Sequence, residues 1–185
     1  MRTIPSVTDT LPAIEAAHRS GDERATRSAI STLTGAAYDL FTFRIESRHE
    51  HRQASIETAA AMELFGALAA LLMSSPVHLM LIPIFEQLRR HQEHLLPVET
   101  IDALDDVADG KRENIAMALH DLALIERTSG TGQARFEGLE RYIGDETRAL
   151  LLELGLIEPQ EPEATTHPHL TARGHAAFHY TQLQH

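Results

Sequence analysis

The residues best suited to chemistry in this chain are the cationic, hydroxyl and amide side chains between positions 111 and 148. Those that we predict to contact DNA are Lys111, Arg112, Asn114, Arg127, Thr131, Gln133, Arg135 and Arg148. Arginine and asparagine at the start of a helix have the geometry to contact guanine and adenine edges, and polar side chains on a hairpin can contact phosphates. The pattern favours a DNA-reading surface, although the same residue types also occur at ordinary solvated helix starts and hairpin tips.

The segment RTSGTGQAR, over residues 127–135, carries two arginines and no acid. Gly130 and Gly132 can supply the unusual backbone angles of a hairpin. Because the segment follows a predicted helix over about 112–123, it is typical of a wing that contacts the DNA backbone beside a helix in the major groove.

The charge balance argues against DNA binding. The formal net charge is −11, and residues 96–185 hold 16 acids against 7 Lys or Arg, so this half contributes −9. Affinity for nucleic acid comes mainly from cations that replace condensed counterions. The alternative hypothesis is therefore an acidic module that binds another protein, or that mimics the charge of DNA, without binding DNA.

Other chemistry has little support in the sequence. There is no cysteine, no Gly-x-Ser-x-Gly turn, no phosphate loop and no dinucleotide fingerprint, so we expect no enzyme activity and no cofactor.

Twelve histidines include the close pairs His49/His51, His91/His94 and His167/His169. His91 and His94 could face one ion from a helix, but the sequence places no third ligand beside them, and we expect no metal site.

The sequence predicts that the chain positioning these candidate residues is mainly α-helical. Residues 1–95 predict a helical bundle that dimerises or binds an effector, with turns at 18–24, 49–55 and 73–76. Within a predicted helix over 24–48, apolar residues recur at three- and four-residue steps, which indicates one buried stripe: Ile30, Leu33, Ala37, Leu40 and Phe41.

The next predicted helices cover about 55–73 and 83–95. The first is apolar nearly all round, so it should lie at the centre of the bundle or at a subunit interface, and we expect a homodimer through this region. Glu57 and Glu63 and the high alanine content favour a buried or dimerising helix over a membrane anchor. The N-terminus lacks the apolar core of a signal peptide, so we expect a cytoplasmic protein with no membrane partner.

From residue 97 the pattern changes to short helices separated by polar turns. We predict a helix over about 99–108, a tight turn at Asp109-Gly110, the 112–123 helix and a strand that begins near Leu124. Shifting the sequence by 32 residues aligns DLALIER (121–127) with ELGLIEP (153–159). This repeat predicts two tandem units, at about 97–136 and 137–180.

The second unit is less suited to DNA. Its helix offers Arg148 but begins with Asp145 and Glu146, and the following loop is rich in glutamate before His167 and His169. We therefore expect the second unit to serve packing, dimerisation or partner binding. A strand that returns near Leu170 should lead into a final helix entered through Thr171.

Residues 97–180 resemble winged helix-turn-helix regulators of the MarR and PadR type. In that family, a segment like ELGLIE closes the recognition helix and one like LTARG opens the helix after the wing, as at 153–158 and 170–174 here. The resemblance implies a sequence-specific, DNA-binding transcriptional regulator that acts as a dimer on two half-sites. In architecture alone, the acidic half is also somewhat similar to the tandem winged-helix accessory subunits of bacterial condensins, which fits the alternative of a protein-binding module. Residues 1–95 resemble no family.

Overall fold

The computed structural model describes residues 3–129, 143–159 and 168–183, and these are mainly helical, as predicted. The chain divides between Leu95 and Leu96 into two compact units, each with its own hydrophobic core. Each unit is therefore described separately.

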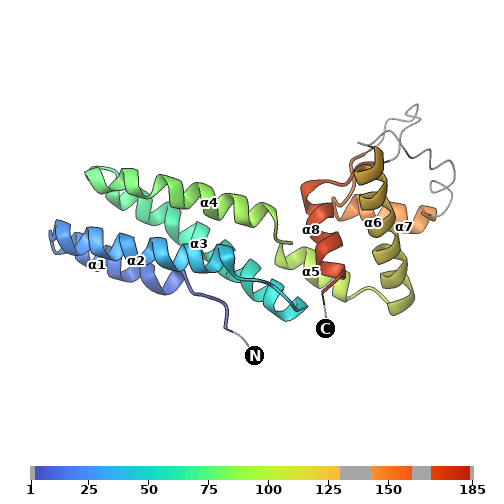
Figure 1. The fold of residues 1–185 in the computed structure, drawn as a ribbon, viewed down its shortest axis with the longest axis horizontal. Helices are drawn as coiled ribbons and strands as arrows, with labels where there is room; N and C mark the ends of the chain where they lie inside the picture. Colours follow the sequence, from blue (N-terminus) through green and yellow to red (C-terminus); the bar gives the residue numbers. More distant parts are fainter. Residues whose placement is uncertain (1–2, 130–142, 160–167, 184–185) are drawn as a thin grey trace. The chain divides into compact units, whose positions relative to one another are not determined.

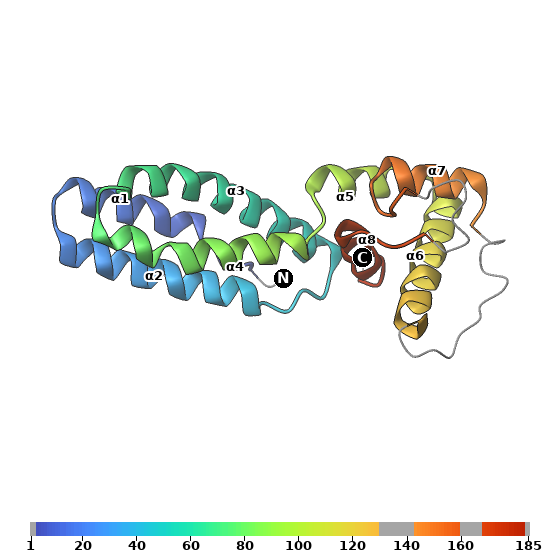
Figure 2. The same cartoon turned by 90° about the horizontal axis from the view of Figure 1, so that it is seen from above.

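The N-terminal unit is a bundle of α-helices and short 3-10 turns. Its elements are η1 (Thr8–Thr10), α1 (Leu11–Arg19), α2 (Glu23–Thr42), α3 (Arg48–Leu72), η2 (Pro76–Met80) and α4 (Ile82–Glu93). Figures 1 and 2 show the α-helices of this unit running side by side, with α1 packed against α2 and α3, and α4 packed against α3 and α2.

The predicted stripe on α2 forms part of the bundle core. Its first four members are at most 1% exposed, and Phe41 is partly buried against them. The helix begins at Asp22, whose carboxylate accepts the N–H of Ala25 at 2.9 Å, and it ends at Thr42 because Phe43 adopts an extended backbone. The stripe was predicted correctly, whereas the end at residue 48 was wrong.

The predicted turn over 49–55 is wrong, because α3 already begins at Arg48. The hydroxyl of Ser47 accepts the N–H of Glu50 at 3.2 Å, and the Glu50 carboxylate accepts the N–H of Glu46 at 2.8 Å. These two hydrogen bonds satisfy backbone groups at the helix start. His51 and Ala54 are both buried, so the polar run HEHRQ continues the buried face of α3 instead of interrupting it.

One described helix, α3, is long and apolar enough to cross a membrane by length and composition. Within the bundle it packs on α1 and α4, and 33% of its most apolar window is buried. Other residues of this helix, among them Leu64 and Leu71, are exposed.

The C-terminal unit contains α5 (Val98–Asp105), α6 (Asp109–Ser129), α7 (Asp145–Glu153) and α8 (Ala172–Thr181). Two expectations are wrong here. Asp109 and Gly110 are the first residues of α6 rather than a turn, and Leu124 lies inside α6 rather than in a strand. The helix continues because the buried residues keep helical spacing to its last turns: Ile115, Ala118, Leu119, Leu122 and Ile125.

His91 is a titratable group whose pKa clearly departs from its ordinary value. Burial lowers the pKa of His91 below its usual 6.5, and the neighbouring His94 lowers it further. The ring of His91 lies 5.5 Å from that of Phe41, and its buried Nε2 atom has no hydrogen-bond partner. The bundle therefore favours the neutral imidazole.

Acid should destabilise the N-terminal unit through His91. Below pH 6.5 the unfolded chain binds a proton at this residue more readily than the folded chain does, so the free energy of unfolding should fall as the pH falls through this range. Thermal unfolding between pH 7.5 and pH 5, a range that spans the ordinary pKa of histidine, should show a shallower pH dependence in His91→Leu than in the wild type. His94→Gln should reduce the pH dependence of thermal unfolding less than His91→Leu does. An equal pH dependence in all three proteins would contradict the destabilising role of His91 in acid.

Candidate interaction surface of the C-terminal unit

The candidate surface is built around the junction that follows α7. Gly155 adopts a left-handed conformation, with φ of 65°, which a residue with a side chain rarely accepts. Its N–H donates to the carbonyl of Leu152 at 3.0 Å, and the N–H of Leu156 donates to the carbonyl of Leu151 at 2.8 Å. This pair of bonds satisfies the last carbonyls of α7 and turns the chain away from the helix axis.

After this turn the chain forms an antiparallel bridge between Ile157 and Leu170. The N–H of Glu158 donates to the carbonyl of His169 at 2.8 Å, and the N–H of Thr171 donates to the carbonyl of Leu156 at 3.1 Å. The bridge thus holds together the two ends of the loop over 158–169, which the resemblance places as the wing before the final helix. Residues 160–167 of this loop, which include His167, lie outside the described residues.

The final helix is entered through Thr171, as predicted. The Thr171 hydroxyl accepts the N–H of Gly174 at 3.0 Å and donates to the carbonyl of Gly155 at 2.7 Å. A Cβ atom at position 174 would lie 1.9 Å from the carbonyl oxygen of Leu156, so only glycine allows α8 to approach this closely. The motifs ELGLIE and LTARG therefore contain the two glycines that join α7 to α8.

A single carboxylate connects this junction to α6. Glu126 accepts the N–H of Leu170 at 2.6 Å, and it lies 3.0 Å from Nε2 of His175 and 3.5 Å from Nδ1 of His169. The sequence did not single out Glu126 or His175, because their partners lie more than forty residues away along the chain. The glutamate fixes the base of the loop against α6.

A groove of ≈ 300 Å³ runs between the start of α6 and α7. It is lined by Lys111, Asn114, Ile115, Glu146, Thr147, Ala149, Leu150 and Glu153. Its floor is apolar, and its rim is polar. Across the groove, Lys111 forms an ion pair with Glu146.

The predicted DNA-contacting residues at the start of α6 are used within the chain. Arg112 donates to the backbone carbonyls of Asp105 and, at 3.0 Å, Val107, and it pairs with Asp109 at 3.7 Å. The guanidinium therefore satisfies carbonyls at the end of α5 and is only 27% exposed. Of Lys111, Arg112 and Asn114, only Asn114 is exposed on the groove and makes no such contact with the described part of the chain.

The other candidates are distributed differently. Arg127, near the end of α6, and Arg148, on α7, are exposed. Thr131, Gln133 and Arg135 lie outside the described residues, as do Gly130 and Gly132.

An exposed strip of α7 beside the groove carries a carboxylate at each end and apolar residues between them. Glu146, Ala149, Leu152 and Glu153 follow one another at helical spacing and are exposed, with Leu152 at 39%. A helix that faced phosphate groups would be opposed by these carboxylates.

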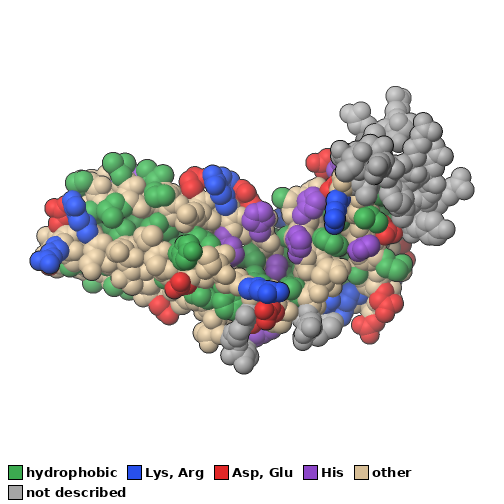
Figure 3. Space-filling model, viewed as in Figure 1, with side chains coloured by type: hydrophobic (Ala, Val, Ile, Leu, Met, Phe, Trp, Pro, Cys, Tyr) green, Lys and Arg blue, Asp and Glu red, His purple; other side chains and the backbone are tan. Residues whose placement is uncertain are grey.

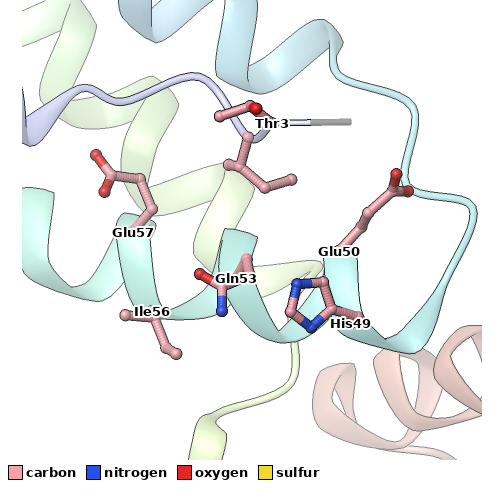
Figure 4. A pocket seen from close by; sticks show the side chains of 7 residues that line it. Thr3, His49, Glu50, Gln53, Ile56 and Glu57 are labelled. Atoms are coloured by element: carbon pink, nitrogen blue, oxygen red, sulfur yellow. The ribbon is translucent and has the colours of Figure 1, made fainter. Parts of the chain in front are cut away.

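A hollow in the N-terminal unit is a structural feature rather than a site. It measures ≈ 430 Å³ and is lined by α3 residues and by Thr3 and Ile4 of the N-terminal segment (Figure 4). One of the carboxylates in its lining, that of Glu57, accepts the N–H groups of Val7 at 2.7 Å and Thr8 at 2.8 Å. The carboxylate thus holds the N-terminal segment against α3.

The pairs His49/His51 and His91/His94 do not come together with further ligands among the described residues. Within residues 3–129, 143–159 and 168–183, no three His, Asp or Glu side chains form a group that could hold a metal ion. His91 packs against an aromatic ring, and His51 is buried in the bundle.

Nothing matches this chain among known protein families, characterised proteins or solved structures. The resemblance to winged-helix regulators therefore rests on the short motifs at 153–158 and 170–174. Because both motifs serve to join α7 to α8, they specify how these helices meet rather than what their surface binds.

Gly174→Ala should unfold or strongly destabilise the C-terminal unit. The added methyl group would overlap the Leu156 carbonyl, and relieving the overlap should cost about 2–3 kcal/mol or more. Chemical denaturation followed by circular dichroism measures this loss. Gly110→Ala is the matched control, because nothing lies within 4 Å of its added methyl group. It should leave stability unchanged or raise it by up to about 1 kcal/mol, and equal losses in both variants would contradict the close contact at Gly174.

Proposed function

We propose that the protein is a non-catalytic interaction protein whose C-terminal unit binds a cationic, partly apolar segment of another protein along α7 and the adjoining groove. One observation carries the proposal. The two cations predicted to read bases at the start of α6 are engaged within the chain, Lys111 by Glu146 of α7 and Arg112 by backbone carbonyls, while α7 also exposes Asp145 and Glu153.

The charge of the described C-terminal residues supports a basic partner. They contain twelve Asp or Glu residues against five cations, which are Lys111, Arg112, Arg127, Arg148 and Arg173. An acidic surface raises the local concentration of a cationic partner and repels phosphate. Complementary charge would steer the encounter and set the orientation of the complex.

An apolar contact should supply part of the affinity. Leu152 is exposed between Glu146 and Glu153, beside a groove floored by Ile115 and Leu150. Apolar side chains that are buried at the centre of a small interface and surrounded by polar residues contribute much of its binding energy. A helical segment with spaced Lys or Arg and Leu side chains would fit both features.

The second candidate remains a DNA-binding regulator. It is favoured by one observation: Arg127 is exposed near the end of α6, and the sequence that follows to residue 135 contains another arginine and no acid. Such a protein would contact DNA through Arg127, Thr131, Gln133 and Arg135 rather than through the start of α6.

A direct comparison of two probes tests the proposal. Fluorescence anisotropy should detect binding of a synthetic Lys/Leu amphipathic helical peptide, and no binding of either the upstream region of the gene or a scrambled duplex, at about 50 mM salt. Binding of the upstream duplex alone, weakening steeply with salt, would overturn the proposal in favour of the regulator.

Paired substitutions locate the peptide site. Glu146→Gln with Glu153→Gln should weaken peptide binding about three- to tenfold, because two rim charges are lost. Glu99→Gln with Asp106→Asn removes the same net charge from exposed positions on and just after α5, and should change binding little. Equal weakening by both pairs would show that net charge, and not the α7 face, attracts the peptide.

A further inference from the structure

The N-terminal unit exposes an apolar surface that no described part of the chain covers. Residues 64–85 contain no Asp, Glu, Lys or Arg, although the chain as a whole carries a net charge of −11. Six large apolar side chains of this stretch are exposed: Leu64, Leu71, Met73, Leu79, Met80 and Ile82. Figure 3 shows hydrophobic side chains gathered at the end of this unit where α3 passes through η2 into α4.

The surface has a shape that suits a second helix. Along the outward face of α3, Gly66, Ala67 and Ala70 are small and exposed, and a Cβ atom at Gly66 would meet nothing within 4 Å. Small residues allow the backbones of two helices to approach closely.

Two hollows border this strip of small residues. A hollow of ≈ 280 Å³ lies towards α1, with walls that include Leu64 and Leu71. Another of ≈ 220 Å³ lies towards η2 and α4, with walls that include Phe65 and Ile82. Large side chains of a facing helix could occupy these hollows.

We propose that α3 forms a homodimer with α3 of a second copy, in an antiparallel crossing centred on Gly66. The same apolar face on both copies satisfies the requirement of a two-fold interface, in which one patch must complement itself. This interface is independent of the function proposed for the C-terminal unit.

Charge favours a second copy at this face and sets the direction of the crossing. Two copies with a net charge of −11 repel each other, and residues 64–85 add nothing to that repulsion. Two acids border the face: Glu15 of α1 lines the adjoining hollow, and Glu63, just before the uncharged stretch on α3, is exposed. A parallel crossing would bring both Glu63 carboxylates together, whereas an antiparallel one would place each of them near the partner's Ala70.

The area is sufficient for a specific dimer. The six exposed side chains present on the order of 600 Å² per copy, so an interface that covered all of them on both copies would bury about 1,200 Å², at the lower end of specific interfaces. A membrane surface fits less well, because helices that lie on membranes carry Lys or Arg beside their apolar face, and residues 64–85 contain neither.

Sedimentation of the full chain tests the dimer. At about 50 µM the wild type should sediment at twice 20.5 kDa, and added salt should strengthen the dimer because it screens the repulsion between the two copies. Gly66→Gln should weaken the dimer at least tenfold, because the added side chain blocks the close crossing. Gly35→Gln is the matched control: Gly35 is also an exposed helical glycine with open space around its Cβ position, but it lies on α2, and its variant should remain dimeric.

Cross-linking gives a second measurement. Because the chain has no cysteine, Gly66→Cys introduces a single thiol, which should form a disulfide-linked dimer under mild oxidation faster than Gly35→Cys does. A wild type that stays monomeric, a dimer that Gly66→Gln leaves intact, or equal cross-linking at both positions would overturn the proposal. A monomer that binds phosphatidylcholine vesicles through this face would also overturn it, and would assign the surface to a membrane.

Discussion

The C-terminal unit depends on the contact between the backbone of Gly174 and the carbonyl of Leu156. The absence of a side chain at 174 lets the first turn of α8 lie directly on the residue that follows the end of α7. Thr171 caps that turn and also bonds the carbonyl of Gly155, while Glu126 holds the adjacent Leu170 from α6. Three helices and the base of the 158–169 loop therefore take their positions from a few backbone groups. The exposed strip of α7 beside the groove is presented on this frame.

The two aligned sequence segments show how a single residue can determine whether a helix ends or continues. DLALIER and ELGLIEP align at a shift of 32, and both end in a run that reads as a strand. At Gly155 the chain adopts a positive φ, α7 ends and a bridge follows. The aligned residue in the first phrase is Ala123, for which that conformation is costly, and α6 continues to Ser129. The sequence pattern alone indicates a repeat of two similar segments. Gly155 lets the helix end in the second segment, whereas the helix continues through Ala123 in the first.

Local signals in the sequence were sufficient for much of the fold. The helical character, the α2 stripe and the Thr171 cap follow from spacing and from capping residues within a few positions of one another. The start of α3 was missed because its polar residues resemble a turn, although one side of that run faces the core. The contacts of the candidate site were harder to predict. Arg112 was assigned to DNA from its residue type, but its partners are carbonyls at the end of the preceding helix, and Lys111 pairs with a residue 35 positions away. Such pairings depend on how helices meet, which composition does not reveal.

The Glu57 carboxylate has a consequence for the order in which the bundle assembles. It binds the N–H groups of Val7 and Thr8, and the first of these lies 50 residues earlier in the chain. During synthesis the N-terminal segment therefore leaves the ribosome long before its binding partner, and its backbone must stay hydrated until α3 is complete. The slow step of folding should then be the closure of this long loop, because distant contacts form only after chain entropy has been lost. The nascent bundle would remain open on this side until the middle of α3 is made.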